Sequence, residues 1–241
     1  MTASLTLAHF HERIAEKTKD RSTAPVVIVA LGDSVTQGVA EVDHLLGAET
    51  YHQVLLRLLE RQYPLCTFSV INAGVDGSSA EGSLDRLHRD ALHHLPDLLI
   101  VGFALNDATC GGFEYRETYK AALRTIIERA RAETKADILL LTPNMMVTRP
   151  NDAVHETHLG LVERFIAVQA DGVLPSYAEA IREVGAETGV PVADVYAEWE
   201  KMAQAGQDTT AMLSNGLNHP DAERHKLAAE TILQKLVGAS A

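Results

Sequence analysis

Hydrophobic residues follow two patterns that alternate along the chain. In the first, runs of about five or six residues are almost entirely hydrophobic and rich in valine, isoleucine and leucine. Such runs are typical of strands that are buried on both faces of a parallel sheet. The predicted strands are residues 26–31, 67–72, 98–103, 137–142 and 191–195.

The segments between these runs have hydrophobic residues at every third or fourth position, which is the period of an amphipathic helix. The predicted helices are residues 50–63, 116–134, 177–188 and 221–236. Strands that alternate with helices form parallel βαβ units, so the sequence predicts an α/β fold, a three-layer α/β/α sandwich around a parallel sheet. Ligands bind such sheets at the carboxyl ends of the strands.

Residues suited to acyl transfer follow the predicted strands. Ser34 can act as a nucleophile if a base accepts its proton, and His219, shortly before the last helix, is the candidate base. The charge that develops on the substrate oxygen needs preorganised donors. The backbone N–H groups of Ser34 and Gly74 and the side-chain amide of Asn106 can supply them. This chemistry needs neither a metal nor an organic cofactor, and we expect neither.

These residues lie in four short sequence blocks. The blocks are GDS at 32–34, NAGVDG at 72–77, ND at 106–107 and NHP at 218–220. With them the chain resembles the SGNH hydrolases, the GDSL esterase and lipase family, over most of its length. The resemblance implies a flavodoxin-like sheet of five parallel strands and ester hydrolysis by Ser34 and His219 through an acyl-enzyme. It also implies that Gly74 and Asn106 belong to the oxyanion hole.

Two of the blocks depart slightly from the usual family pattern. The first reads GDSV instead of GDSL, and Ala104 stands two residues before Asn106, where a glycine is usual. Asp33 and Asp107, the neighbours of the two site residues, are expected to support their loops rather than to take part in the reaction.

The fourth block departs most. Family members commonly have an aspartate three residues before the histidine to orient it, but here that position is Gly216. An acid in this role fixes the tautomer and stabilises the imidazolium. Asp208, Asn215, Asn218 or a backbone carbonyl could hold His219 instead. Asp208 ranks first because of its charge and its position in a loop.

Several residues also have simpler interpretations. Ser34 could be only a helix cap in a turn after a strand. The HETH sequence at 155–158 suggests a metal site, but its spacing is not HExxH, and a solvated helix start fits better, so we expect no metal there. Trp199 and Tyr196 are expected to pack a helix on the sheet, although either could line an acyl or sugar pocket.

Composition narrows the function classes. Of the 241 residues, 46% are hydrophobic, as in ordinary globular domains. The net charge is −12, which argues against nucleic-acid or membrane binding and favours a small ester substrate. We expect one hydrolase domain over residues 1–241, with an N-terminal helical extension at 1–24. Without a secretory leader or metal-type cysteine spacing, a cytoplasmic location with Cys66 and Cys110 reduced is expected. The oligomeric state does not follow from the sequence.

The function expected from the residues and the resemblance is a serine esterase that hydrolyses small carboxylic esters, with acetyl groups on a carbohydrate as the leading substrate. One alternative is a lysophospholipase or thioesterase type of acyl hydrolase. Another is a catalytically silent ligand-binding domain on the same fold, which the missing aspartate and Ala104 motivate.

Overall fold

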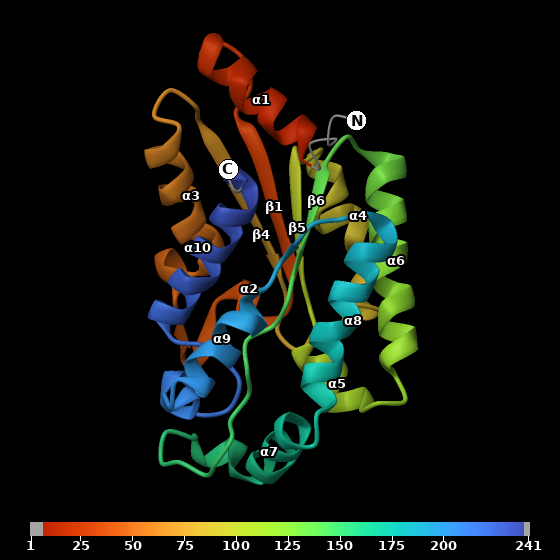
Figure 1. Cartoon of the computed structure of the whole chain (residues 1–241). Helices are drawn as coiled ribbons and strands as arrows, with labels where there is room; N and C mark the ends of the chain where they lie inside the picture. The colour runs from red at the N-terminus through yellow and green to blue at the C-terminus, as the bar shows by residue number, and fades with distance from the viewer. Residues whose placement is uncertain (1–6, 239–241) are drawn as a thin grey trace.

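A parallel five-stranded sheet forms the centre of the protein in a computed structural model that describes residues 7–238 (Figure 1). The strands are β1 (Val26–Gly32), β4 (Phe68–Gly74), β5 (Leu98–Gly102), β6 (Asp137–Leu141) and β7 (Val192–Ala193). Their order is β4-β1-β5-β6-β7, so the second of these strands along the chain lies outside the first. This is the flavodoxin-like order, and the predicted fold class is confirmed.

Helices cover both faces of the sheet (Figure 1). One face packs against α1 (Ala8–Lys19), α3 (Tyr51–Gln62), α9 (Val195–Gln204) and α10 (Ala222–Val237). The other packs against α4 (Leu87–Asp90), α5 (Leu105–Gly111), α6 (Arg116–Glu133) and α8 (Val173–Thr188). The short α2 (Ser34–Gln37) and α7 (Val162–Ala170) lie towards the carboxyl ends of the strands.

Minor elements complete the described chain. A small antiparallel hairpin consists of β2 (Val39–Glu41) and β3 (His44–Leu45). The 3-10 turns are η1 (Gly47–Glu49), η2 (Gly82–Asp85), η3 (Leu92–His94), η4 (Glu156–Leu161) and η5 (Thr209–Met212).

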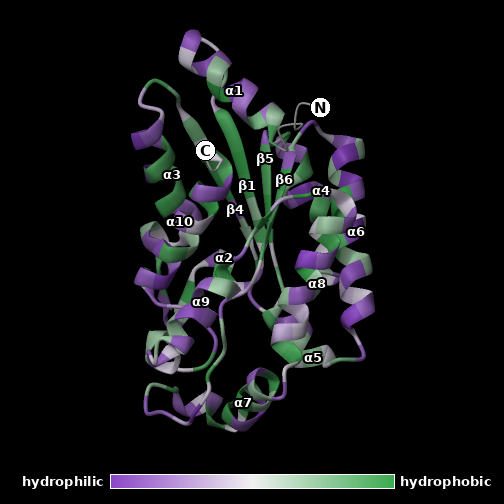
Figure 2. Ribbon diagram, viewed as in Figure 1, coloured by the Kyte–Doolittle hydropathy of each residue, from purple (hydrophilic) through white to green (hydrophobic). Residues whose placement is uncertain are grey.

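Two hydrophobic cores, one on each face of the sheet, explain why the strands appear as unbroken hydrophobic runs. Side chains alternate along β1: Ile28 and Ala30 belong to the core under α3 and α10, whereas Val29 and Leu31 belong to the core under α6 and α8. Figure 2 shows the hydrophobic colouring concentrated in the strands, with polar residues on the helices around them.

The described part of the predicted N-terminal extension, residues 7–24, is attached to the sheet rather than projecting from it. Phe10 and Ile14 of α1 are buried in the core. The Asp137 carboxylate accepts the Phe10 backbone N–H at 2.8 Å, and the Asp97 carboxylate accepts the Arg13 Nε–H at 3.1 Å. α1 therefore packs across the amino-terminal side of the sheet, and residues 1–6 lie outside the described chain.

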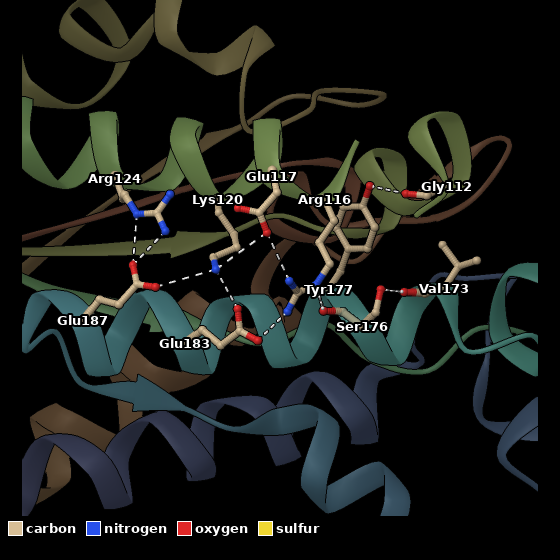
Figure 3. Close-up of polar contacts among 10 residues, drawn as sticks. All are labelled: Gly112, Arg116, Glu117, Lys120, Arg124, Val173, Ser176, Tyr177, Glu183 and Glu187. Carbon is tan, nitrogen blue, oxygen red and sulfur yellow. Dashed lines mark hydrogen bonds and ion pairs between the residues drawn. The ribbon is translucent and has the colours of Figure 1, made fainter. Parts of the chain in front are cut away.

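Ion pairs connect α6 and α8 on the outer surface (Figure 3). Glu183 accepts from Arg116 at 2.6 Å and from Lys120 at 2.7 Å, and Glu187 accepts from Arg124 at 2.8 Å. Charged residues thus continue, at the protein surface, the contact that hydrophobic residues make beneath them.

The predicted boundaries fail at two places. The last strand is only two residues long, because Asp194 caps α9 by accepting the Ala197 backbone N–H and so ends the strand. The helix predicted at 177–188 begins earlier, at Val173, directly after Gly172 in a left-handed conformation (φ 83°). Cys66 and Cys110 are both free, the first buried and the second exposed.

No helix within residues 7–238 combines the length and the hydrophobicity that crossing a membrane requires.

Candidate active site

A tight turn at the end of β1 places Ser34 at the carboxyl edge of the sheet. Asp33 caps α2, with its Oδ1 accepting the Val35 backbone N–H at 3.0 Å. Ser34 is the first residue of α2, and Gly38 (φ 94°) ends this helix after a single turn. Ser34 is buried, so its hydroxyl lies beneath the surface of the protein.

Glycines at adjacent strand ends allow α2 to lie this close to the sheet. Gly32 pairs with Gly74 on one side and with Gly102 on the other. A Cβ atom on Gly32 would lie 2.1 Å from the Thr36 Oγ1, and one on Gly74 would lie 2.1 Å from the Gln37 backbone nitrogen. Side chains at these two positions would push the nucleophile turn off the strand ends.

His219 lies beside Ser34, with 2.9 Å between its Nε2 and the Ser34 Oγ. These residues are 185 positions apart in the sequence, and the turn before α10 brings them together. Burial lowers the pKa of His219 below its usual 6.5, although the charge of Asp76 and the Ala40 carbonyl oppose this effect. The imidazole is therefore neutral at neutral pH and can accept the serine proton.

The Asn215 side chain holds the turn that carries His219. Its Oδ1 accepts the backbone N–H groups of Leu217, Asn218 and His219, each at 3.0 Å. The Asn144 amide adds a bond of 2.8 Å to the Asn218 carbonyl. Asn215 thus holds the histidine through the backbone, not through the imidazole ring.

The structure does not place Asp208 against His219, which corrects the expectation from the sequence. Asp208 caps η5, pairs with Arg149, and has 46% of its side chain exposed. The His219 Nδ1 is buried and forms no hydrogen bond with any residue between 7 and 238. The Asp208 carboxylate thus binds a surface arginine and not the ring of His219.

The three expected oxyanion donors differ in their present contacts. The Ser34 backbone N–H has no hydrogen-bond acceptor among the described residues. Asn106 donates one Nδ2 hydrogen to the Ser78 carbonyl at 3.0 Å, which leaves the second hydrogen for a substrate. The Gly74 N–H donates to the Asn72 Oδ1 at 2.9 Å, so it must share this bond to serve an oxyanion.

Asp33 and Asp107 each hold a loop of the site. Asp33 caps α2, and the Asp107 Oδ1 accepts the Ala80 backbone N–H at 3.0 Å. Burial is the main cause that raises the pKa of each carboxyl to about 7. Both side chains therefore gain a proton more readily than an exposed aspartate does.

Two hollows lie near Ser34 and His219. A cleft of about 620 Å³ is lined by His219, and its walls include Asp76, His158 and Phe165. A smaller hollow of about 40 Å³ is lined by Asp33, Trp199 and other mostly buried side chains. The cleft is large enough for a small ester, whereas the smaller hollow has room for little more than water.

The HETH segment borders this cleft. His155 caps η4 by accepting the Thr157 backbone N–H, as expected for a helix start. Among residues 7–238, no group of three or more histidine, cysteine, aspartate or glutamate side chains is arranged to hold a metal ion. Trp199 is fully buried against the sheet, and Tyr196 is buried as well.

Sequence reasoning did not identify Arg86. Its guanidinium donates to the backbone carbonyls of Gly32 and Ala73, at 2.8 and 2.7 Å. No side-chain motif indicates such contacts, because the acceptors are backbone atoms that every residue has.

Comparison with known proteins shows which family this chain belongs to. The sequence model of the GDSL-like lipase/acylhydrolase family matches residues 30–227. An acetylxylan esterase of Geobacillus stearothermophilus is 21% identical over 222 residues, covering 87% of this chain and 93% of the relative.

Solved structures show the same fold. A structure of a catalytic mutant of the Geobacillus stearothermophilus acetylxylan esterase superposes with a TM-score of 0.70 at 19% identity, covering 90% of this chain and 96% of the other. An α/β hydrolase from the metagenome of Lake Arreo, Spain, gives 0.68 at 20% identity, covering 91% and 98%. Other mutants of the acetylxylan esterase described as catalytic replace a serine and an aspartate, and the aspartate lies three residues before the replaced histidine.

Proposed function

Because the chain belongs to the GDSL-like lipase/acylhydrolase family, we propose that it is a carboxylic ester hydrolase in which Ser34 is the nucleophile and His219 its base. The observation that carries this proposal is the 2.9 Å contact between the Ser34 hydroxyl and the neutral, buried imidazole. A serine hydroxyl is a weak nucleophile until such a base removes its proton.

The reaction proceeds in two halves. The Ser34 Oγ attacks the ester carbonyl while the His219 Nε2 takes the hydroxyl proton. The Ser34 N–H and the free Nδ2 hydrogen of Asn106 stabilise the charged oxygen of the tetrahedral intermediate. His219 then gives the proton to the leaving alcohol, and water, activated by the same imidazole, hydrolyses the acyl-enzyme.

We propose acetyl groups on a carbohydrate as the substrate. The similarity to an acetylxylan esterase along most of both chains supports this choice. The cleft beside His219 also fits a hydroxylated alcohol, because carboxylates and imidazoles such as Asp76 and His158 line it together with hydrophobic side chains.

The test is hydrolysis of 4-nitrophenyl esters of increasing chain length and of acetylated xylo-oligosaccharides. We expect acetate to be preferred, and Ser34→Ala to lower kcat by at least about a thousandfold. Ser176→Ala is a matched control, because the hydroxyl of this serine on α8 bonds only to the nearby Val173 carbonyl. Equal rates for wild type and Ser34→Ala would refute the mechanism, and a preference for long acyl chains would favour the lysophospholipase or thioesterase alternative.

Labelling with a fluorophosphonate separates an enzyme from a silent binding domain. A neutral imidazole within hydrogen-bond distance should make Ser34 reactive, with one label per chain and none in Ser34→Ala. An unlabelled wild type that still binds acetylated oligosaccharides would support the silent domain.

A further inference from the structure

A single buried arginine connects the segments that carry the oxyanion donors. Arg86 lies between η2 and α4, and only 11% of its side chain is exposed. One terminal nitrogen donates to the Ala73 carbonyl at 2.7 Å and to Asp90 at 3.2 Å. The other donates to the Gly32 carbonyl at 2.8 Å and to the Ser78 hydroxyl at 3.2 Å.

Apart from Asp90, each of these acceptors is close in the sequence or in space to a group that the proposed reaction uses. Gly32 is two residues before Ser34, and Ala73 is directly before Gly74. The Ser78 carbonyl accepts the amide of Asn106, so this segment positions the third donor. Two segments that are distant in the sequence, the end of β1 and residues 73–78 at the end of β4, therefore meet on one guanidinium.

The guanidinium is suited to this task by its shape. It is planar and rigid and presents its N–H groups in a fixed fork, whereas a lysine ammonium is a point charge on a flexible stem. The two carbonyls that it binds belong to adjacent strands. Gly32 is the last residue of β1, and Ala73 of β4 directly precedes Gly74, the residue that pairs with Gly32. The fork therefore adds a side-chain link between strand ends that the backbone also joins, since the Gly32 carbonyl accepts the Val75 backbone N–H at 3.1 Å as well.

We propose that Arg86 is a positioning residue that sets the spacing of the oxyanion donors around Ser34. The inference rests on the proposed esterase function. Donors stabilise an oxyanion only when they are held in place before the reaction, and a displacement of about 1 Å can cost about a hundredfold in rate. Arg86 does not touch the substrate itself, and its effect passes through the backbone of Gly32 and Ala73 and through Ser78.

Steady-state kinetics of Arg86→Ala and Arg86→Lys test this role. Titration with a fluorophosphonate gives the concentration of reactive Ser34 sites, so that kcat is expressed per active site. We expect kcat on a 4-nitrophenyl acetate substrate to fall by about ten- to a hundredfold with KM within about twofold, because only transition-state stabilisation is lost. Lysine retains the charge without the fork and should restore little. Added guanidinium at low millimolar concentration should partly restore Arg86→Ala.

Arg116→Ala is the matched control. Arg116 is also a largely buried arginine that bonds to a backbone carbonyl and a carboxylate, those of Ser176 and Glu183, in the contact between α6 and α8 (Figure 3). If the role of Arg86 is purely structural, Arg86→Ala and Arg116→Ala should both have lower thermal stability, and both should keep the wild-type kcat per titrated site. That result would overturn the proposal, as would full activity of Arg86→Lys, which folds with a charge at the same place.

Amide hydrogen exchange measured by mass spectrometry distinguishes failure of this inference from failure of the proposed function. Residues 32–38 and 72–79 should exchange faster in Arg86→Ala than in wild type, and should not change in Arg116→Ala. This readout needs no catalysis. If wild type and Ser34→Ala hydrolyse esters equally, the proposed function is refuted, whereas unchanged exchange at both segments refutes the inference about Arg86.

Discussion

At the scale of single residues, Ala104 is in a conformation that a residue with a side chain rarely adopts. It is the N-cap of α5, with φ at 155° and ψ at −33°, and it is fully buried. The usual glycine of the family at this place is free of the steric conflict that a Cβ creates. The backbone just before Asn106 is therefore strained, and the surrounding core holds it there.

Ala104→Gly should relieve this strain. Such backbone conformations cost about 1–3 kcal/mol, whereas the extra freedom of glycine in the unfolded chain costs about 1 kcal/mol, so we expect the free energy of unfolding to rise by about 1 kcal/mol. Ala108→Gly is the control, because Ala108 is equally buried but lies inside α5. It should lose about 1 kcal/mol or more. Denaturant titration measures both, and equal losses in the two variants would show that Ala104 is not strained.

At the scale of elements, the turn between η5 and α10 acts as a unit. The Ser214 backbone N–H donates to the His219 carbonyl at 2.8 Å and closes the turn. Asn215 satisfies three N–H groups inside it, and the Asn151 amide donates to the Gly216 carbonyl at 2.8 Å from outside. The position of the imidazole therefore depends on the turn as a whole, in place of a carboxylate bound to the ring.

Asn215→Ala should damage this element. It leaves three N–H groups without their acceptor, so we expect the free energy of unfolding to fall by about 2 kcal/mol and kcat to fall at least about tenfold. Asn215→Asp keeps the acceptor oxygen and should keep most of the activity. Kinetics and thermal denaturation check the pair. Wild-type behaviour of the alanine variant would show that the rest of the chain positions His219 unaided.

At the scale of the whole molecule, buried carboxyl groups and buried imidazoles have opposite effects on how stability depends on pH. Burial raises the pKa of Asp33 and Asp107 to about 7 and lowers the pKa of His52 to about 4 and of His225 to about 3. As pH falls from about 7 to about 4, the carboxyls take up protons in the folded state first, which adds stability. The imidazoles take up protons in the unfolded state first, which removes stability over the same range.

Asp33→Asn should therefore lose more stability than wild type as pH falls from about 6.5 to 4.5, because it lacks one of the two carboxyls that oppose the buried imidazoles, which include His219. A difference of one bound proton between the folded and unfolded states changes the free energy of unfolding by about 1.4 kcal/mol per pH unit. This sets the expected difference in slope between Asp33→Asn and wild type. Asp171→Asn changes an exposed aspartate and should follow wild type. Urea titrations across this range measure the free energy of unfolding at each pH. Parallel curves for wild type and Asp33→Asn would show that the Asp33 carboxyl does not contribute to the pH dependence.

The parts of this molecule that the sequence predicts are those encoded by neighbouring residues. The strands are recognisable because both faces of each are buried, and Ser34 and His219 are recognisable because each belongs to a short block. Asp208 was assigned wrongly because its partner, Arg149, lies 59 residues away in the sequence. Arg86 escaped notice for a related reason, since it binds carbonyl groups of the backbone.

The small hollow that Asp33 lines also contains a natural fluorescent reporter. Trp199, the single tryptophan of the chain, is fully buried in the wall of this hollow. All indole fluorescence therefore arises from one buried position, shielded from soluble quenchers. Trp199 does not line the cleft beside His219, so a ligand in that cleft can alter this emission only indirectly. The spectrum thus reports on the strand ends that hold Ser34 without any added dye.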